Sequence, residues 1–185
     1  MKERKETIDL KTANMVSIVI FVASTVVCLG AQFAVWGCDK DVLLETLSSS
    51  FPGSLLFFVA LVAGIVVHEL VHGITWACFA PSGFKSISFG VIWKMLTPYC
   101  HCDEPLLVKH YMAGAGMPLV VLGIIPSVVG VAVNSLALNL FGIIFIASAA
   151  GDILVMWRLR KEAACNTVLD HPSEAGYLVY EPDDE

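Results

Sequence analysis

Four long apolar stretches dominate the sequence and limit what it can fold into. They run over about residues 15–36, 54–79, 111–133 and 136–157, and each is long enough as a helix to cross a bilayer, which takes about 20 apolar residues. The composition agrees, because 57% of the residues are hydrophobic, 15% are charged and the mean hydropathy is +0.76. We therefore predict an all-α membrane protein with four transmembrane helices, in which residues 1–185 form a single integral membrane domain.

The positions of lysine and arginine predict the orientation, because positively charged loops stay in the cytoplasm. An N-in, C-in topology places the tails 1–14 and 158–185 and the loop 80–110 in the cytoplasm. Of the eleven lysines and arginines, only Lys40 then lies outside. The first stretch exceeds the roughly 7–15 apolar residues of a signal peptide, so we interpret it as a true span. We expect a multi-pass protein in the cell membrane of a prokaryote, with the lipid bilayer as a partner.

The loop between the second and third stretches carries a β pattern. Its residues from Phe84 to Met95 alternate in part and are rich in β-branched and aromatic types. They predict a short β-hairpin or a re-entrant loop, and an amphipathic connector on the membrane surface is the alternative. An exposed strand edge there would be able to hold an extended substrate through main-chain hydrogen bonds. His101 and Asp103 of this loop are candidates to orient a ligand or donate to an oxyanion, and solvated loop residues are the alternative.

Only four ionisable side chains interrupt the apolar stretches: His68, Glu69, His72 and Asp152. Ionisable groups are costly inside a bilayer, so those that occur there are usually functional. His68, Glu69 and His72 form the HExxH pattern, in which two imidazoles hold zinc and the glutamate handles protons. On a helix the two imidazoles lie about 40° apart on one face, so both can reach one metal ion.

Asp152 has an expected depth similar to that of the histidines. His72 lies about 10 Å from the cytoplasmic end of its stretch and Asp152 about 8 Å from the same face, at 1.5 Å per residue. A catalytic zinc takes three protein ligands and keeps a fourth position open. We therefore predict His68, His72 and Asp152 as metal ligands and Glu69 as the catalytic residue, whereas a buried polar cluster that only joins helices is the alternative. Other candidates for the third ligand are the histidines outside the stretches, His101, His110 and His171.

The segment His68-Glu69-Leu70-Val71-His72 in one apolar helix, with Gly151-Asp152 in another, resembles the site-2 protease class of intramembrane zinc metalloproteases. The chain is also similar to a family of small four-span membrane proteins described as putative zincin peptidases. The residues that carry this second resemblance begin at about Phe57 and include Pro98–Leu106, Lys109–Tyr111 and Asp170–Gly176. The resemblance implies that the histidines and the aspartate bind Zn²⁺. It also implies that Glu69 activates water for peptide hydrolysis.

These observations predict an intramembrane zinc metalloprotease. It would hydrolyse peptide bonds of membrane-embedded or membrane-adjacent substrates through a zinc-activated water near the cytoplasmic face, so a membrane protein or peptide is the expected substrate. The alternative is a non-catalytic metal-binding membrane protein, either a carrier or a stabilising partner. Glu69 separates the two, because a structural site needs no acid–base group beside its ligands. The net charge of −6, without a basic patch, argues against nucleic acid as a partner.

Overall fold

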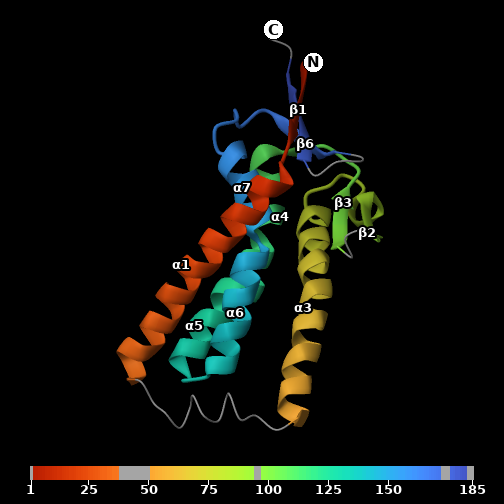
Figure 1. Cartoon of the computed structure of the whole chain (residues 1–185). Coiled ribbons are helices and arrows are strands. Elements are labelled where there is room, and N and C mark those ends of the chain that lie inside the picture. Colours follow the sequence, from red (N-terminus) through yellow and green to blue (C-terminus); the bar gives the residue numbers. More distant parts are fainter. Residues whose placement is uncertain (1, 38–50, 94–96, 172–175, 183–185) are drawn as a thin grey trace.

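The computed structural model describes residues 2–37, 51–93, 97–171 and 176–182 (Figure 1). The described chain is mostly helical, with a smaller amount of antiparallel sheet. The helices, in chain order, are α1 (Leu10–Trp36), α3 (Phe51–Ala77), α4 (Val108–Pro118), α5 (Ile125–Ala132), α6 (Leu136–Ser148) and α7 (Ala150–Leu159). A π-helical stretch, Leu119–Ile124, joins α4 to α5, so these two helices continue one another.

Three of the predicted apolar stretches are continuous helices long and apolar enough to cross a membrane. They cover Lys11–Trp36, Gly53–Ala77 and Val108–Ala132. The fourth stretch was predicted as one helix over 136–157, but the structure divides it into α6 and α7, which meet at a bend of 49°. The backbone leaves the helical conformation at Ala149. This break places the N-terminus of a new helix inside an apolar region of the sequence.

A tight connection turns the chain back between α5 and α6. Asn134 adopts a left-handed conformation (φ 54°), which asparagine tolerates better than most residues. The amide of Ser135 then donates to the carbonyl of Gly130 at 2.8 Å, and the Ser135 hydroxyl accepts from the amide of Leu138 at the start of α6. The two helices therefore pack as an antiparallel pair.

A buried polar cluster holds α1 against α6. The side-chain amide of Asn139 donates to the Gln32 side chain at 2.7 Å and to the carbonyl of Cys28 at 3.1 Å. Gln32 in turn donates to the side chain of Asn134 at 3.1 Å. Because an apolar surrounding offers polar groups no other partners, this cluster fixes how α1 lies on the α5–α6 pair.

A hairpin lies between the second and third stretches, but the predicted range 84–95 includes only its first strand, and residues 94–96 lie outside the described chain. Strand β2 (Ile87–Ile92) pairs antiparallel with β3 (Thr97–Cys102), and a 3₁₀ turn over Gly83–Ser86 precedes it. The hairpin packs on α3 at Gly73, where a Cβ would come within 2.6 Å of the Phe89 ring. Figure 1 shows it beside the end of α3 that leads into it.

A four-stranded antiparallel sheet, which the sequence analysis did not predict, gathers both tails at one end of the molecule (Figure 1). Its order is β1-β6-β5-β4, formed by β1 (Lys2–Thr7), β6 (Gly176–Glu181), β5 (Thr167–Asp170) and β4 (Leu106–Leu107). The buried faces of these strands meet α4 and α7 in a core that includes Tyr111, Leu159, Val168, Tyr177 and Val179. The tails 1–14 and 158–185 therefore contribute to a packed structure.

Candidate metal centre

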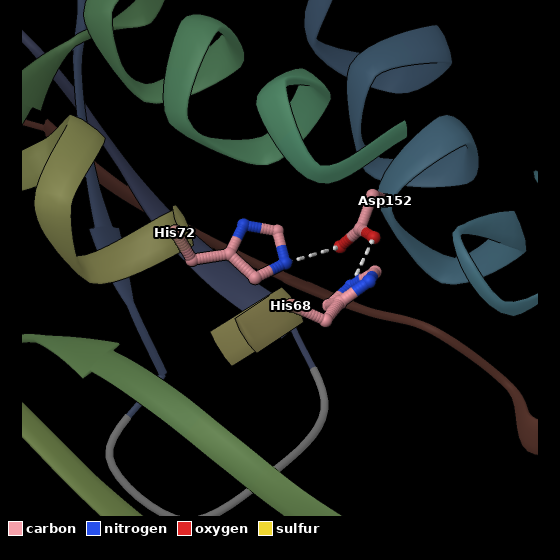
Figure 2. A group of neighbouring side chains, drawn as sticks. All are labelled: His68, His72 and Asp152. Carbon is pink, nitrogen blue, oxygen red and sulfur yellow. Dashed lines mark ion pairs between the residues drawn. The ribbon is translucent and has the colours of Figure 1, made fainter. Parts of the chain in front are cut away.

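Two histidines of α3 and one aspartate of α7 meet inside the helical part of the molecule (Figure 2). His68 and His72 are buried, with 8% and 5% of their surface exposed, and their ring centroids are 4.8 Å apart. Asp152 lies in the first turn of α7, where the helix dipole favours a negative charge. One of its oxygens lies 3.3 Å from His68 Nε2 and the other lies 3.4 Å from His72 Nε2.

These three side chains fit a zinc ion. Each offers one ligand atom, and the three atoms lie within 4.8 Å of one another. Zinc bonds to nitrogen and oxygen are about 2.0–2.1 Å long, so two ligands of a tetrahedral zinc lie about 3.3 Å apart. The distances of 3.3 and 3.4 Å, each to a different oxygen of Asp152, are close to this spacing. Among the described residues, His68, His72 and Asp152 are the only group of three such side chains.

Two contacts fix the orientation of the His72 ring, a hydrogen bond at its edge and a stacked aromatic ring. Its Nδ1 lies 2.9 Å from the carbonyl oxygen of Gly114 on α4, and we assign the Nδ1–H tautomer from this contact. The ring also stacks on Trp76 with centroids 5.2 Å apart. Trp76 Nε1 donates to the carbonyl of Tyr111 at 3.0 Å, so α4 supports both the histidine and the ring beneath it. Such outer partners orient a metal ligand and leave the other ring nitrogen free to bind.

The ring of His68 packs on the opposite side of the site. It stacks with Phe145 of α6 at a centroid distance of 6.5 Å, and Phe145 is itself buried. Gly64, one turn before His68 on α3, allows this approach, since a Cβ at that position would come within 2.7 Å of the Phe145 ring. The close approach of the Phe145 ring to α3 therefore depends on a glycine.

Glu69 lies near His68 and Asp152 but is not a member of the ligand group. Its carboxylate is within hydrogen-bonding reach of the main-chain amide of Cys100 on β3. Cys100 pairs with Phe89 across the hairpin, and the hairpin packs on the same helix as Glu69. Strand β3 thus restrains the carboxylate of Glu69, which is predicted to be catalytic. The strand itself contributes no metal ligand.

The three alternative histidines lie elsewhere, and within the described chain none of them joins the ligand group. His101 lies 3.2 Å from Asp103 and 3.8 Å from Asp170. The ring of His110 stacks on Phe79 with centroids 4.2 Å apart. The amide of His171 donates to the carbonyl of Gly176. The structure therefore brings only Asp152 to the two histidines of α3.

Asp170 is a buried carboxylate that the sequence analysis did not single out. It accepts hydrogen bonds from the Tyr111 hydroxyl and, at 2.9 Å, from the main-chain amide of Cys102. Burial raises the pKa of the Asp170 carboxyl above its ordinary value, and these two hydrogen bonds oppose that shift because they favour the charged form. A signal was present in the sequence, since alternation along β5 places Asp170 on the same face as the fully buried Val168.

Comparison with known proteins gives one match. A family model described as "Putative zincin peptidase" matches residues 61–166, a segment that includes the HExxH helix, the hairpin and Asp152. No curated protein and no solved structure matches the chain. A zincin peptidase family implies a metallopeptidase with a zinc cofactor. Because the matched segment exceeds half of the 185 residues, the chain belongs to the family of putative zincin peptidases.

Proposed function

We propose that the protein is an intramembrane zinc metalloprotease of the site-2 protease type. Its substrates would be membrane-embedded or membrane-adjacent segments, cut near the cytoplasmic face. The observation that carries this proposal is that His68, His72 and Asp152 lie close enough together to bind one metal ion. Glu69 lies next to this group without being one of its three ligands. Membership of a zincin peptidase family supports the peptidase chemistry, and the apolar helices support its location in a membrane.

We also propose four membrane crossings, with both tails in the cytoplasm. Strands β1 and β6 are hydrogen-bonded neighbours, and one precedes all of the helices whereas the other follows them. Two strands of one sheet lie on one side of a bilayer, so the chain between them crosses an even number of times. The three continuous apolar helices and the bent pair α6–α7 together satisfy this condition.

The three ligands would be His68 Nε2, His72 Nε2 and a carboxylate oxygen of Asp152. Zinc bound by them would act as a Lewis acid and lower the pKa of a water molecule toward neutrality. The carbonyl of Gly114 holds the Nδ1 side of His72, which keeps Nε2 directed at Asp152 (Figure 2). The arrangement is therefore oriented by α4 as well as by α3 and α7.

Glu69 would move the protons of the reaction. Its carboxylate can accept a proton from the attacking water and later donate it to the leaving amine, as a general base and then a general acid. The amide of Cys100 lies within hydrogen-bonding reach and limits the positions that this carboxylate can adopt. Restraint of this kind reduces the entropy that must be lost before proton transfer.

An extended substrate backbone would pair with the hairpin at β2 and not at β3. Alternate residues of an antiparallel strand direct their amides to the same edge, and at the outer edge of β3 the amide of Cys102 already donates to Asp170 while Pro98 has no amide hydrogen. In the described sheet β3 pairs only with β2. A peptide added to the hairpin would therefore lie along the outer edge of β2, through main-chain hydrogen bonds that tolerate many side chains.

The test compares wild type with Glu69→Gln and Asp152→Ala. Zinc per chain is measured in the purified protein, and cleavage is measured on a panel of co-expressed, tagged single-span membrane proteins. Glu69→Gln should retain zinc and lose cleavage, whereas Asp152→Ala should lose zinc. If Glu69→Gln also loses zinc, the proposed division of roles is wrong. Full zinc binding without cleavage of any panel member by wild type would favour a non-catalytic metal-binding protein.

A further inference from the structure

We propose that Asp170, at the end of β5, is a positioning residue for the metal centre. The inference rests on the function proposed above. Asp170 lies after the segment matched by the family model, residues 61–166, and outside the apolar helices. It nevertheless contacts the two elements, β3 and α4, that hold Glu69 and His72 in place.

The carboxylate of Asp170 is buried, with 9% of the residue exposed, and both of its oxygens are engaged. One accepts the amide of Cys102 at 2.9 Å, and the other accepts the hydroxyl of Tyr111. His101 Nδ1 lies 3.8 Å from the first oxygen. A buried carboxylate without such donors is strongly disfavoured, so these contacts tie β5 firmly to both β3 and α4.

The first connection runs along β3 to Glu69. Cys102 and Cys100 are two residues apart on the strand, so their amides point to the same edge. Asp170 takes the amide of Cys102, and the carboxylate of Glu69 lies at the amide of Cys100. Two carboxylates on different elements thus share one strand edge, and the position of Asp170 sets where that edge lies relative to α3.

The second connection runs through aromatic rings to His72. The Tyr111 ring stacks on Trp76 at 5.2 Å, and its carbonyl accepts the Trp76 Nε1–H at 3.0 Å. Trp76 stacks in turn on His72, at 5.2 Å with an angle of 17° between the rings. Gly114, three residues after Tyr111 on α4, supplies the carbonyl at His72 Nδ1. Holding the Tyr111 hydroxyl therefore fixes the part of α4 that orients the ligand.

A buried carboxylate could serve only the stability of the sheet, and the two roles predict different results. If Asp170 is only structural, its removal lowers the unfolding temperature and leaves the metal site of the folded protein unchanged. If it is a positioning residue, removal changes the affinity and geometry of the metal site even in folded protein. Metal binding and its spectrum report this difference without any need for proteolysis.

The experiment uses the full chain in detergent with Asp170→Asn and Tyr111→Phe. Zinc affinity is measured by competition with a chromophoric chelator, and the ligand geometry is measured from the visible absorption spectrum of the Co²⁺-substituted protein. Both variants should bind zinc about tenfold more weakly, the lower end of the loss seen when partners of metal ligands are removed. They should also show an altered Co²⁺ spectrum. The matched controls are Asp9→Asn, at the exposed N-cap of α1 where asparagine caps as well as aspartate, and Tyr180→Phe, on β6, and both should behave as wild type.

Wild-type zinc affinity and an unchanged Co²⁺ spectrum in both folded variants would overturn the inference. If Asp170→Asn does not fold, Tyr111→Phe decides the question alone, because it keeps the ring and removes only the hydroxyl. A wild type that binds zinc but cleaves nothing would refute the proposed protease and leave this inference intact. A wild type that binds neither metal would refute both.

Discussion

Gly114 is the position at which a single methyl group should disturb the metal centre most. It lies on α4 with its carbonyl 2.9 Å from His72 Nδ1. A Cβ built there would lie 2.7 Å from Cε2 of Trp76 and closer still to Nε1 and Cδ1 of the same ring. Real Cβ atoms do not approach other atoms so closely, so Gly114→Ala must move either the ring or α4. Both are in contact with His72.

The expected cost follows from these contacts. Overpacking of a closely packed core costs about 1–3 kcal/mol. Displacing the buried Trp76 ring also strains its hydrogen bond to Tyr111, and a buried group left without its partner costs about 1–3 kcal/mol. Since one movement causes both losses, we expect Gly114→Ala to lower the free energy of unfolding by about 2–4 kcal/mol. For a chain of this size that corresponds to a fall of roughly 4–16 °C in unfolding temperature.

The measurement is thermal unfolding of the purified protein together with its zinc affinity. Gly30→Ala is the matched control, because Gly30 lies in α1 and a Cβ there would meet nothing within 4 Å. That control should be neutral or slightly stabilising, since alanine favours a helix more than glycine does. If Gly114→Ala unfolds at the same temperature as the control and binds zinc as wild type does, the packing of Trp76 against α4 described above is incorrect.

Three further outcomes are expected. Gln32→Leu removes one buried and one partly buried hydrogen bond between α1 and the α5–α6 pair. It should lower the free energy of unfolding by about 1–3 kcal/mol, at about 0.6–1.7 kcal/mol for each interhelical bond. An unchanged unfolding temperature would count against the cluster. Chelation of zinc should lower the unfolding temperature of wild type, because a ligand at 1,000 times its Kd stabilises the folded protein by about 4 kcal/mol. The same chelation should change the unfolding temperature of Asp152→Ala little. Equal shifts in wild type and variant would exclude the aspartate as a ligand. Hydrogen bonds from the Ser82 side chain and amide hold the pKa of Glu104 below its ordinary value, so its contribution to stability is present above the unfolded pKa and is lost as the pH falls through the folded pKa. Glu104→Gln should therefore reduce the loss of stability on acidification, and identical melting profiles for variant and wild type between pH 7 and 3 would contradict this.

Hydrophobicity alone predicted the long helices closely. The stretches expected at 15–36, 54–79 and 111–133 correspond to helical segments within a few residues at each end, because twenty apolar residues in a row have few other stable arrangements. The fourth stretch was expected to be straight, and the break at Ala149 was not recognised. Alanine and serine are tolerated in helices, so the run before Asp152 carries no residue that requires a bend.

The two halves of the site differ in how readily a sequence reveals them. His68 and His72 share a helix, so their spacing alone predicts a common face. Apart from the family resemblance, Asp152 was matched to them by depth alone, which shows that two residues can be level but not that their helices touch. The structure supplies this second fact, with distances of 3.3 and 3.4 Å to the imidazoles. Asp170 was harder to find, because its partners Tyr111 and Cys102 lie 59 and 68 residues away along the chain.

The terminal sheet was missed for a related reason. Its strands are short, and β1 pairs with β6 across nearly the whole chain, with Lys2 opposite Glu181. Charged residues fill the exposed β1, so its sequence resembles that of a solvated tail. Local patterns indicate that a segment can be a strand, but they do not identify a partner at such a distance.

The pairing of β1 with β6 also sets an order of assembly during synthesis. β6 follows every described apolar helix and β1 precedes them all, so their ladder can form only after the last of these helices has been synthesised. The HExxH helix is synthesised about 90 residues before β5 and its Asp170. A newly made chain would therefore present His68 and His72 before the strand that carries Asp170, and under the function proposed above full activity would begin only once translation has passed β6.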